Sequence, residues 1–271
     1  MARKGAYAVA QFNLNGFEWV KAALETAKSS NSAIILGVTE QAAAYMCGYS
    51  SIAAMVREMD RSLKLEQPII LHADHCSFAA AELAIKSGFT SVMYDGSHCH
   101  IDENCLNTRK IVQLAAMYGV STEAEAGGVG GEEDGISGRG EIASPEDCKM
   151  LADCGIDALA AGIGNIHGLY PDNWQGLDFE ALEKINSATN SMPLALHGGS
   201  GIEEKMLKES ILRGISKINV NTECKIAFCR AVGKAAEKNY SSPQKLYETG
   251  IAAIKEIMME KLRHFGGMGK A

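Results

Sequence analysis

Short apolar runs alternate along the chain with longer segments in which apolar residues recur every three or four positions. The runs, which predict strands, cover residues 7–13, 32–38, 68–74, 91–96, 121–127, 157–163, 193–199 and 217–222. The segments with helical spacing include residues 17–29, 78–88, 104–119 and 203–214. Strands that alternate with helices indicate a parallel sheet, because each parallel connection needs a crossover that is usually a helix.

Residues with special backbone preferences mark several helix boundaries. Gly88, Gly119 and Gly214 follow three of the helical segments, where a left-handed residue often ends a helix. Ser144 followed by Pro145 predicts a helix start. These boundaries agree with the alternation of strands and helices.

The eight predicted strands fit into one chain of 271 residues with no break in composition and no linker. This favours a single domain over residues 1–271, an α/β fold of the (β/α)8 TIM barrel type. An open doubly wound sheet is the alternative. The segment IAAIKEIMMEKLRHF, residues 251–265, predicts an additional C-terminal helix.

The composition excludes several classes of protein. With a net charge of −7 and no face rich in Lys and Arg, the chain lacks the basic surface that a nucleic-acid partner requires. No apolar run reaches the roughly 18 residues of a membrane span, and the N-terminus enters a strand pattern without a signal peptide. Eight cysteines without CxxC spacing are typical of free thiols, so we expect a cytoplasmic protein.

Three of the predicted strands end in, or lead to, a histidine. His75 follows the third strand directly, His167 follows the sixth, and His197 ends the seventh. In a barrel the C-terminal ends of the strands converge on one face. Three imidazoles there, with an open position for substrate, are typical of a catalytic zinc site, so we predict a metal site.

Other side chains compete with this interpretation. His98 and His100 lie in a less constrained loop after the fourth strand, and Cys76 adjoins the third strand's histidine. His72 is expected to face the barrel interior or a ligand, and His264 in the terminal helix is expected to be solvated. Each histidine taken alone could also be an ordinary core or surface residue.

Two turns rich in glycine and polar residues follow the last two strands. HGGSG, residues 197–201, and NVNT, residues 219–222, fall where many barrels bind phosphate. Glycine lets backbone N–H groups approach an anion, and Ser200 and Thr222 add hydroxyl groups. Tight turns alone would explain the glycines but not Ser200, Asn219 and Thr222.

The segment GGVGGEEDGISGRG, residues 127–140, directly follows the fifth strand, which carries Glu123 and Glu125. Its composition is typical of a flexible surface loop. Because it lies at the functional face, we expect a mobile lid that brings Glu132 or Glu133 over the substrate. A carboxylate there suits proton transfer at a carbon beside a carbonyl.

Motifs that span nearly the whole chain identify a family. They read YAVAQFN, ILGVTE, LHADHCSF, GFTSVMYDGSH, EAEAGGVGGEEDG, IGNIHGLY, LALHGGSGI and KINVNTE. In this order they resemble the class II, metal-dependent ketose-bisphosphate aldolases, and the fructose-1,6-bisphosphate and tagatose-1,6-bisphosphate enzymes both fit. The resemblance implies a lyase of carbohydrate metabolism that cleaves a ketose 1-phosphate or 1,6-bisphosphate into dihydroxyacetone phosphate and an aldehyde.

The resemblance also implies the metal site and the base. His75, His167 and His197 would hold Zn²⁺, with Glu125 as a further ligand in some states. Asp74 would take the proton of the C4 hydroxyl in cleavage and return it in condensation. The motif HADH would thus place an acid/base beside a metal ligand.

The remaining roles that the resemblance implies concern the substrate. Glu133 would move the proton on the dihydroxyacetone-phosphate carbon, and Asn219 would bind the enediolate. The residues expected to bind the substrate or its phosphate are Asn13, Gly168, Gly198, Ser200, Asn219, Asn221 and Thr222. A monovalent cation near the phosphate and a homodimer or homotetramer are further expectations.

The chain departs from the family pattern in two places. The family usually has another helix before the first strand, so the barrel floor is expected to be covered differently. The family also has an arginine that clamps the distal phosphate, but residues 243–256 contain none, and Glu248 or Ile251 stands there. Lys245, Lys255 or a neighbouring subunit could replace it; otherwise a weaker preference for bisphosphates is expected.

Two functions of other classes stay open at this point. A metal-dependent isomerase or epimerase on the same barrel would share the enediolate chemistry but release no triose phosphate. A non-catalytic sugar-phosphate-binding barrel would bind the substrate without turnover. The identity of the aldehyde and the stereochemistry at C4 do not follow from the residues.

Overall fold

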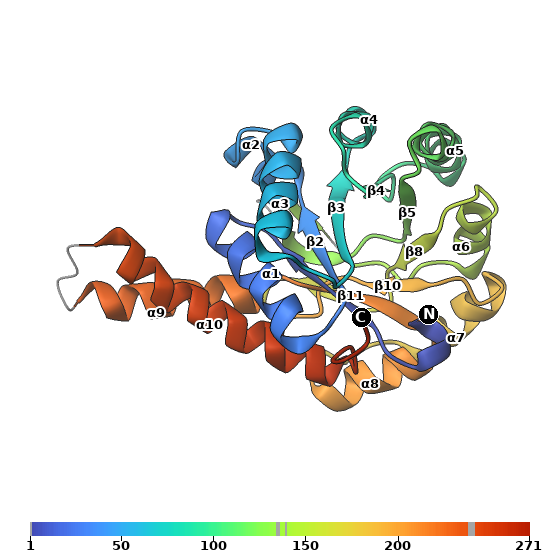
Figure 1. The fold of residues 1–271 in the computed structure, drawn as a ribbon. Coiled ribbons are helices and arrows are strands. Elements are labelled where there is room, and N and C mark those ends of the chain that lie inside the picture. The colour runs from blue at the N-terminus through green and yellow to red at the C-terminus, as the bar shows by residue number, and fades with distance from the viewer. Residues whose placement is uncertain (1, 134–135, 139, 238–241) are drawn as a thin grey trace.

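A computed structural model describes residues 2–133, 136–138, 140–237 and 242–271, with the backbone alone for residues 132–133 and 136–138. Its centre is a closed barrel of eight strands in the order β1-β11-β10-β8-β5-β4-β3-β2 (Figure 1). The strands are β1 (Val9–Asn13), β2 (Ile34–Val38), β3 (Ile69–Cys76), β4 (Ser91–Tyr94), β5 (Ser121–Ala126), β8 (Ala158–Ala161), β10 (Leu194–Leu196) and β11 (Ile215–Val220). These are the eight strands that the apolar runs predict, so the TIM-barrel prediction is confirmed.

Closure of the barrel depends on the first and last strands. β1 pairs in parallel with β2 on one side and with β11 on the other, where Gln11 is opposite Asn219. An open doubly wound sheet would leave both edges unpaired, so that alternative is wrong. The pairing also brings the C-terminal ends of β1 and β11 together on one face.

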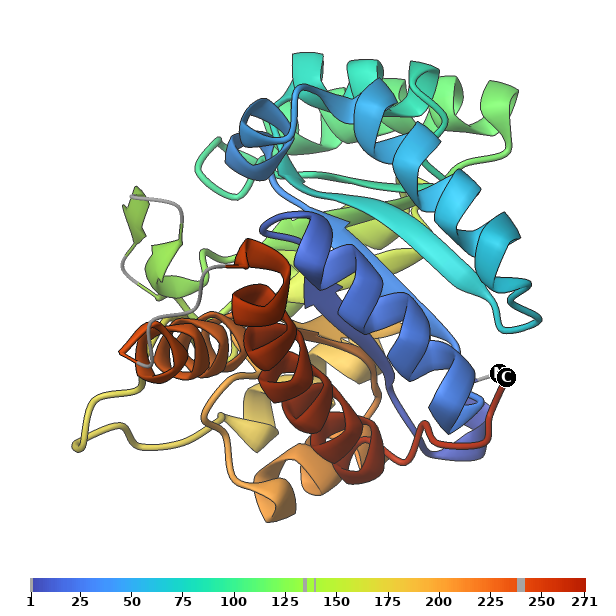
Figure 2. The ribbon, with the colours of Figure 1, turned by 60° about the vertical axis from the view of Figure 1, so that its left-hand side comes forward.

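Helices surround the barrel (Figures 1 and 2). They are α1 (Phe17–Ser30), α2 (Glu40–Tyr45), α3 (Tyr49–Leu63), α4 (Phe78–Lys86), α5 (Ile101–Tyr118), α6 (Pro145–Ala152), α7 (Phe179–Ala188), α8 (Glu204–Leu212), α9 (Thr222–Ala236) and α10 (Pro243–His264), with a 3-10 turn η1 (Arg3–Gly5). Ser144 caps α6 by accepting a hydrogen bond from Asp147 N, as the sequence predicts. No helix in the described ranges is both long enough and apolar enough to cross a membrane.

The last two helices leave the barrel together as a hairpin (Figure 1). α10 returns along α9 and packs against α1, and Trp19 of α1 lies 4.6 Å from Phe228 of α9 between ring centroids. This confirms the additional C-terminal helix. At the bottom of the barrel, Arg3 in η1 donates to Met192 O and Asn186 Oδ1, so η1 covers part of the floor.

The segment after β5 differs from the expected loop. It contains β6 (Gly130–Glu133) and β7 (Ile136–Gly138), which form a three-stranded sheet with β9 (Ile166–His167). A Cβ atom at Gly131, where φ is +86°, would collide with His167 O. The glycines therefore let this small sheet form beside the site, a feature that the sequence interpretation did not include; the mobility of the segment as a lid stays a prediction.

Candidate active site

An irregularity at the end of β3 turns two consecutive side chains toward the same place. Alternation along a strand would send Asp74 and His75 to opposite faces. The register shifts between Ala73 and Cys76, and His75 has φ of +48°. A left-handed residue at such a bulge re-aims its side chain. As a result both the buried Asp74 and His75 contact residues of the C-terminal face of the barrel.

The structure brings the three predicted histidines together. One ring nitrogen from each of His75, His167 and His197 lies within 4.8 Å of the others. They come from β3, β9 and the end of β10, which are distant in sequence. The sequence interpretation therefore correctly placed them as one cluster, and their role as metal ligands is taken up below.

Two of these imidazoles each have a carboxylate next to the ring nitrogen that faces away from the cluster. His75 Nδ1 lies 2.7 Å from Asp95 Oδ2, and His197 Nε2 lies 3.0 Å from Glu123 Oε1. A carboxylate acceptor assigns the proton to the nitrogen that faces it. The opposite nitrogens, His75 Nε2 and His197 Nδ1, are then both acceptors and face each other at 2.8 Å. A bound cation would relieve this contact, and carboxylate-backed histidines are the usual arrangement at metal sites.

Glu125 adds a carboxyl group to the same cluster. Its side chain is buried, and Oε2 lies 3.5 Å from His197 Nδ1. Among the described residues, no group forms a hydrogen bond with this oxygen. Burial, with the charge of Asp95, raises the pKa of Glu125 to about 8. A buried carboxylate oxygen without a donor, next to acceptor nitrogens, fits a cation site, and the donor set of nitrogen and oxygen suits zinc.

Asp95 is a possible ligand that the sequence reasoning missed. It groups with His75 and Glu125 in a second cluster of three ligand atoms. Burial alone would raise the pKa of Asp95, but hydrogen bonds and charge from His75 and Ser97 outweigh it and keep the pKa well below its usual value. Asp95 directly follows β4. A carboxylate at the C-terminal end of a barrel strand was the sequence signal that could have identified it as a candidate ligand.

Asp74 is an acceptor surrounded by amide donors. Asn13 Nδ2 donates to its Oδ2 at 2.9 Å, and Asn219 Nδ2 lies 3.5 Å from its Oδ1. Burial would raise the pKa of Asp74, but its polar and charged neighbours, Lys217 among them, lower it well below its usual range. The carboxyl is therefore ionised and able to accept a proton.

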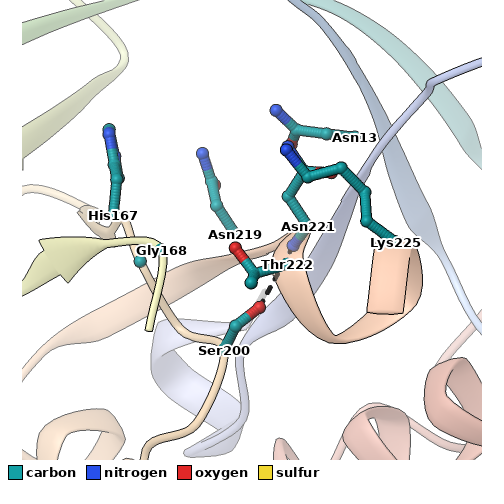
Figure 3. Close-up of a pocket in the computed structure, with 9 residues that line it drawn as sticks. Asn13, His167, Gly168, Ser200, Asn219, Asn221, Thr222 and Lys225 are labelled. Carbon is teal, nitrogen blue, oxygen red and sulfur yellow. Dashed lines mark hydrogen bonds between the residues drawn. The ribbon is translucent and has the colours of Figure 1, made fainter. Parts of the chain in front are cut away.

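A pocket opens beside the histidine cluster (Figure 3). It is lined by Asn13, His167, Gly168, Gly198, Ser200, Asn219, Asn221, Thr222 and Lys225. All seven residues expected to bind substrate or phosphate are in this set. Lys225 was not predicted; it lies one helical turn after Thr222 and is the one cation among these lining residues.

The N-terminus of α9 forms one wall of the pocket. Ser200 Oγ lies 3.3 Å from Asn221 N, a contact drawn in Figure 3, and 3.4 Å from Glu223 N. Gly198 has φ of +69°, and a Cβ there would collide with Ile166 O. Backbone N–H groups at a helix N-terminus, next to glycines and a hydroxyl, form a site suited to phosphate.

The structure also bears on the predictions made for the other histidines and for Cys76. His98 and His100 are exposed, and His100 caps α5, so neither joins the described ligand clusters. Cys76 is buried with its sulfur 3.6 Å from Tyr49 Oη. The prediction that His264 is solvated is met in part, because its side chain is 22% exposed and lies 3.7 Å from Glu204.

The predicted lid acids cannot be placed at the site. Glu132 and Glu133 belong to β6, but their side chains lie outside the described residues. His72, as predicted, is buried inside the barrel, where its Nδ1 lies 2.7 Å from Ser91 Oγ. All eight cysteines are free thiols, in agreement with the sequence interpretation.

The segment expected to lack the phosphate-clamping arginine lies in α10. Glu248 is exposed there and Ile251 is buried. Lys255, one suggested replacement, forms an ion pair of 2.9 Å with Glu25 of α1. The lysine that lines the described pocket is Lys225, and not Lys245 or Lys255.

Comparisons with known proteins agree with this geometry. The family model described as Fructose-bisphosphate aldolase class-II matches residues 1–270. The fructose-bisphosphate aldolase of Mycoplasma genitalium is 44% identical over 278 residues, covering 100% of this chain and 96% of that protein. That of Streptococcus pyogenes serotype M3 is 42% identical over 282 residues, with the same coverage of 100% and 96%. The crystal structure of the YdjI aldolase from Escherichia coli K12 matches with a TM-score of 0.87 at 30% identity, covering 100% of this chain and 96% of that chain.

Proposed function

Because the chain belongs to the class-II fructose-bisphosphate aldolase family, we propose that it cleaves fructose 1,6-bisphosphate into dihydroxyacetone phosphate and glyceraldehyde 3-phosphate. Family membership establishes an aldolase that acts on a sugar phosphate, and not the isomerase or the non-catalytic binding protein. The finer substrate is our proposal, supported by the names of the relatives at 42% to 44% identity.

The observation that carries the proposal is a buried, ionised Asp74 that directly precedes His75 of the histidine cluster and contacts Asn13 and Asn219 of the pocket. We propose that His75, His167 and His197 hold Zn²⁺, with Glu125 as an alternative ligand. The oxygen of Glu125 that lacks a hydrogen-bond donor within the described part of the chain supports this assignment. The chemistry that zinc supplies when bound is Lewis-acid polarisation of the substrate carbonyl.

In the proposed cleavage, Asp74 takes the proton from the C4 hydroxyl while the C3–C4 bond breaks. C4 becomes the aldehyde carbon, and the electron pair of the broken bond remains on the C3 side as an enediolate. The acid form of Glu133 then donates a proton to C3 and releases dihydroxyacetone phosphate; this role rests on the resemblance. Condensation reverses these transfers. General acid–base steps of this kind typically contribute about 10²–10⁴-fold in rate.

The pocket residues support the binding of the dihydroxyacetone-phosphate half. Asn219 Oδ1 is buried and has no hydrogen-bond partner among the described groups, so a substrate hydroxyl could donate to it. The N-terminus of α9, with Ser200, Gly168 and Gly198, would hold the phosphate, while Asn13, Asn221 and Thr222 complete the lining. A monovalent cation beside this phosphate stays a prediction.

Lys225 supports recognition of a second phosphate. Figure 3 shows its side chain extending from α9 on the side of the pocket away from His167. A lysine there offers the positive charge of the arginine that residues 243–256 lack, and it favours the bisphosphate over the expectation drawn from that segment alone. We further propose a cytoplasmic homodimer or homotetramer, consistent with the free cysteines.

A panel assay tests the proposed function. Fructose 1,6-bisphosphate, tagatose 1,6-bisphosphate and the matching 1-phosphates are each supplied to the zinc-loaded protein, with release of triose phosphate coupled to NADH oxidation. We expect zinc-dependent release with the highest kcat/KM for fructose 1,6-bisphosphate. A higher kcat/KM for tagatose 1,6-bisphosphate or a 1-phosphate would contradict the substrate assignment, and zinc-independent release would contradict the metal role.

A further inference from the structure

A lysine inside the barrel connects the metal cluster to the catalytic carboxyl. Lys217 lies on β11 and is 7% exposed. Its Nζ lies 2.6 and 2.8 Å from the two carboxylate oxygens of Glu123 on β5, and 3.3 Å from His72 Nε2 on β3. An ammonium group has three N–H donors. All three therefore have an acceptor, each held by a strand of the barrel.

On one side, Lys217 acts on a proposed metal ligand through Glu123. The ammonium contacts both oxygens of Glu123, and Oε1 also accepts from His197 Nε2 at 3.0 Å. This fixes the carboxylate so that the Nδ1 atom of His197 faces the other ligands. Removing the ammonium would leave a buried carboxylate without its main partner, which is strongly unfavourable and would let Glu123 turn away.

On the other side, Lys217 fixes the protonation of His72. Because an ammonium only donates, His72 Nε2 must accept, and its proton then lies on Nδ1, facing Ser91 Oγ at 2.7 Å. His72 Nε2 is 3.6 Å from Asp74 Oδ1. With Nε2 engaged by Lys217, His72 does not give its proton to Asp74. The carboxyl keeps the Asn13 and Asn219 amides as its donors and remains available to accept the substrate proton.

We propose that Lys217 is a positioning residue of the aldolase. It orients His197 through Glu123, and it keeps the Nε2 atom of His72 unprotonated, so that His72 does not donate to Asp74. Lys217 does not belong to the pocket lining described above, and its ammonium group contacts Glu123 and His72. The inference rests on the proposed metal site. It predicts that one substitution outside the ligand set weakens both zinc binding and proton transfer.

Lys217→Met, which keeps the length of the side chain but removes its donors, is the main variant. We expect its zinc dissociation constant, measured by competition with a chelating indicator at fixed pH, to rise about 10- to 100-fold, as when other second-layer partners of metal ligands are removed. At saturating zinc, kcat for cleavage should also fall at least tenfold while KM changes less than threefold. Lys217→Arg, which keeps a cation, should retain more zinc affinity than Lys217→Met.

A double variant separates positioning from a general loss of structure. In Glu123→Gln/Lys217→Met the amide can still accept from His197 and has no charge that needs a cation. Zinc affinity should therefore be higher than in Lys217→Met alone, a coupling that a purely structural defect would not produce. Lys261→Met is the matched control, because Lys261 is 3% exposed and forms an ion pair of 2.7 Å with Glu223. It removes an equally buried lysine and should leave zinc affinity unchanged.

The outcomes distinguish this inference from the proposed function. If the wild-type protein binds no zinc, the metal site itself is wrong. If the wild type binds zinc and folded Lys217→Met has affinity and kcat within threefold of it, the role of Lys217 is refuted. If Lys217→Met does not fold, the double variant decides: zinc affinity equal to that of Glu123→Gln would support the inference, and a further loss of affinity relative to Glu123→Gln would refute it.

Discussion

Asn13 on β1 donates a hydrogen bond of 2.9 Å to the carboxyl of Asp74 on β3, inside the barrel. The contact orients the carboxyl without neutralising it, because an amide carries no charge. Asn13 Oδ1 in turn accepts a hydrogen bond from Gln11 Nε2 at 3.0 Å on the same strand, so the amide that faces Asp74 is itself held in place. Because Asp74 is held in this way, a side chain of nearly the same shape but different chemistry can replace it. Asp74 is therefore suitable for a conservative substitution.

Asp74→Asn should abolish cleavage while keeping the site assembled. An amide of the same shape cannot accept the C4 proton, so we expect kcat to fall by about 10²–10⁴-fold. Zinc content and binding of dihydroxyacetone phosphate should stay near the wild-type values. Coupled kinetics, metal analysis and calorimetry measure these quantities. A variant with kcat within threefold of the wild type would assign the base to another residue.

Chelation should remove activity, and zinc should restore it. His75→Ala, His167→Ala and His197→Ala are each expected to lose the metal, because each contributes one atom to the cluster. His100→Ala is the control, since His100 is exposed and caps α5. Full activity in protein shown by metal analysis to contain no zinc would overturn the metal-dependent mechanism.

Lys225→Met tests whether this lysine binds the distal phosphate. Truncating a charged contact of this kind usually costs about 2–5 kcal/mol, or about 30- to 4,000-fold in binding. We expect kcat/KM to fall by at least about 30-fold for fructose 1,6-bisphosphate and much less for fructose 1-phosphate. Lys255→Met, which breaks a contact with Glu25 outside the pocket, is the control.

The preference of the wild-type protein between fructose 1-phosphate and the bisphosphate completes this test. If fructose 1-phosphate is cleaved as efficiently as the bisphosphate, the expectation from residues 243–256, which contain no arginine, holds, and Lys225 has no role in distal recognition. Equal losses on both substrates would instead place Lys225 at the proximal phosphate, near the N-terminus of α9.

Gly198→Ala should damage both stability and substrate binding. The residue has φ of +69°, which costs an L-residue about 1–2 kcal/mol, and the new methyl group would also meet Ile166 O. A lower Tm and a raised KM are expected. Gly233→Ala is the matched control, because a Cβ there has no neighbour within 4 Å and α9 should gain about 1 kcal/mol of helix propensity. Unchanged Tm and KM in Gly198→Ala would contradict the described turn.

Thiol labelling of the native protein should separate exposed from buried cysteines. Cys47 and Cys229 are exposed, and no disulfide joins any of the eight. Burial raises the pKa of Cys76, Cys148 and Cys224 to about 12, so little thiolate is present at neutral pH. Mass spectrometry after brief alkylation at pH 7.5 should find modification first at Cys47 and Cys229. Early modification of Cys76 would contradict the packing behind β3.

The barrel could be predicted because each apolar run is bounded by turn residues and followed by a helical pattern. The cluster of histidines could be predicted because parallel strands end on the same face. The small sheet could not, since glycine-rich segments such as Gly127–Gly131 carry no periodicity, and their pairing depends on β9. Lys217 and Asp95 were also missed, because a buried charge is recognised only when its partner is known, and Glu123 lies 94 positions from Lys217.

The pairing of β1 with β11 has a consequence for biosynthesis. Asn13 lines the pocket from the first strand, whereas Asn219 and Asn221 line it from the last strand and the turn after it. A chain that is still being made on the ribosome can form the βα units one after another, but its binding pocket stays incomplete until residue 225 has emerged. The pocket is therefore completed in one step, when the last strand joins the first, and truncated products that lack β11 would not compete for substrate.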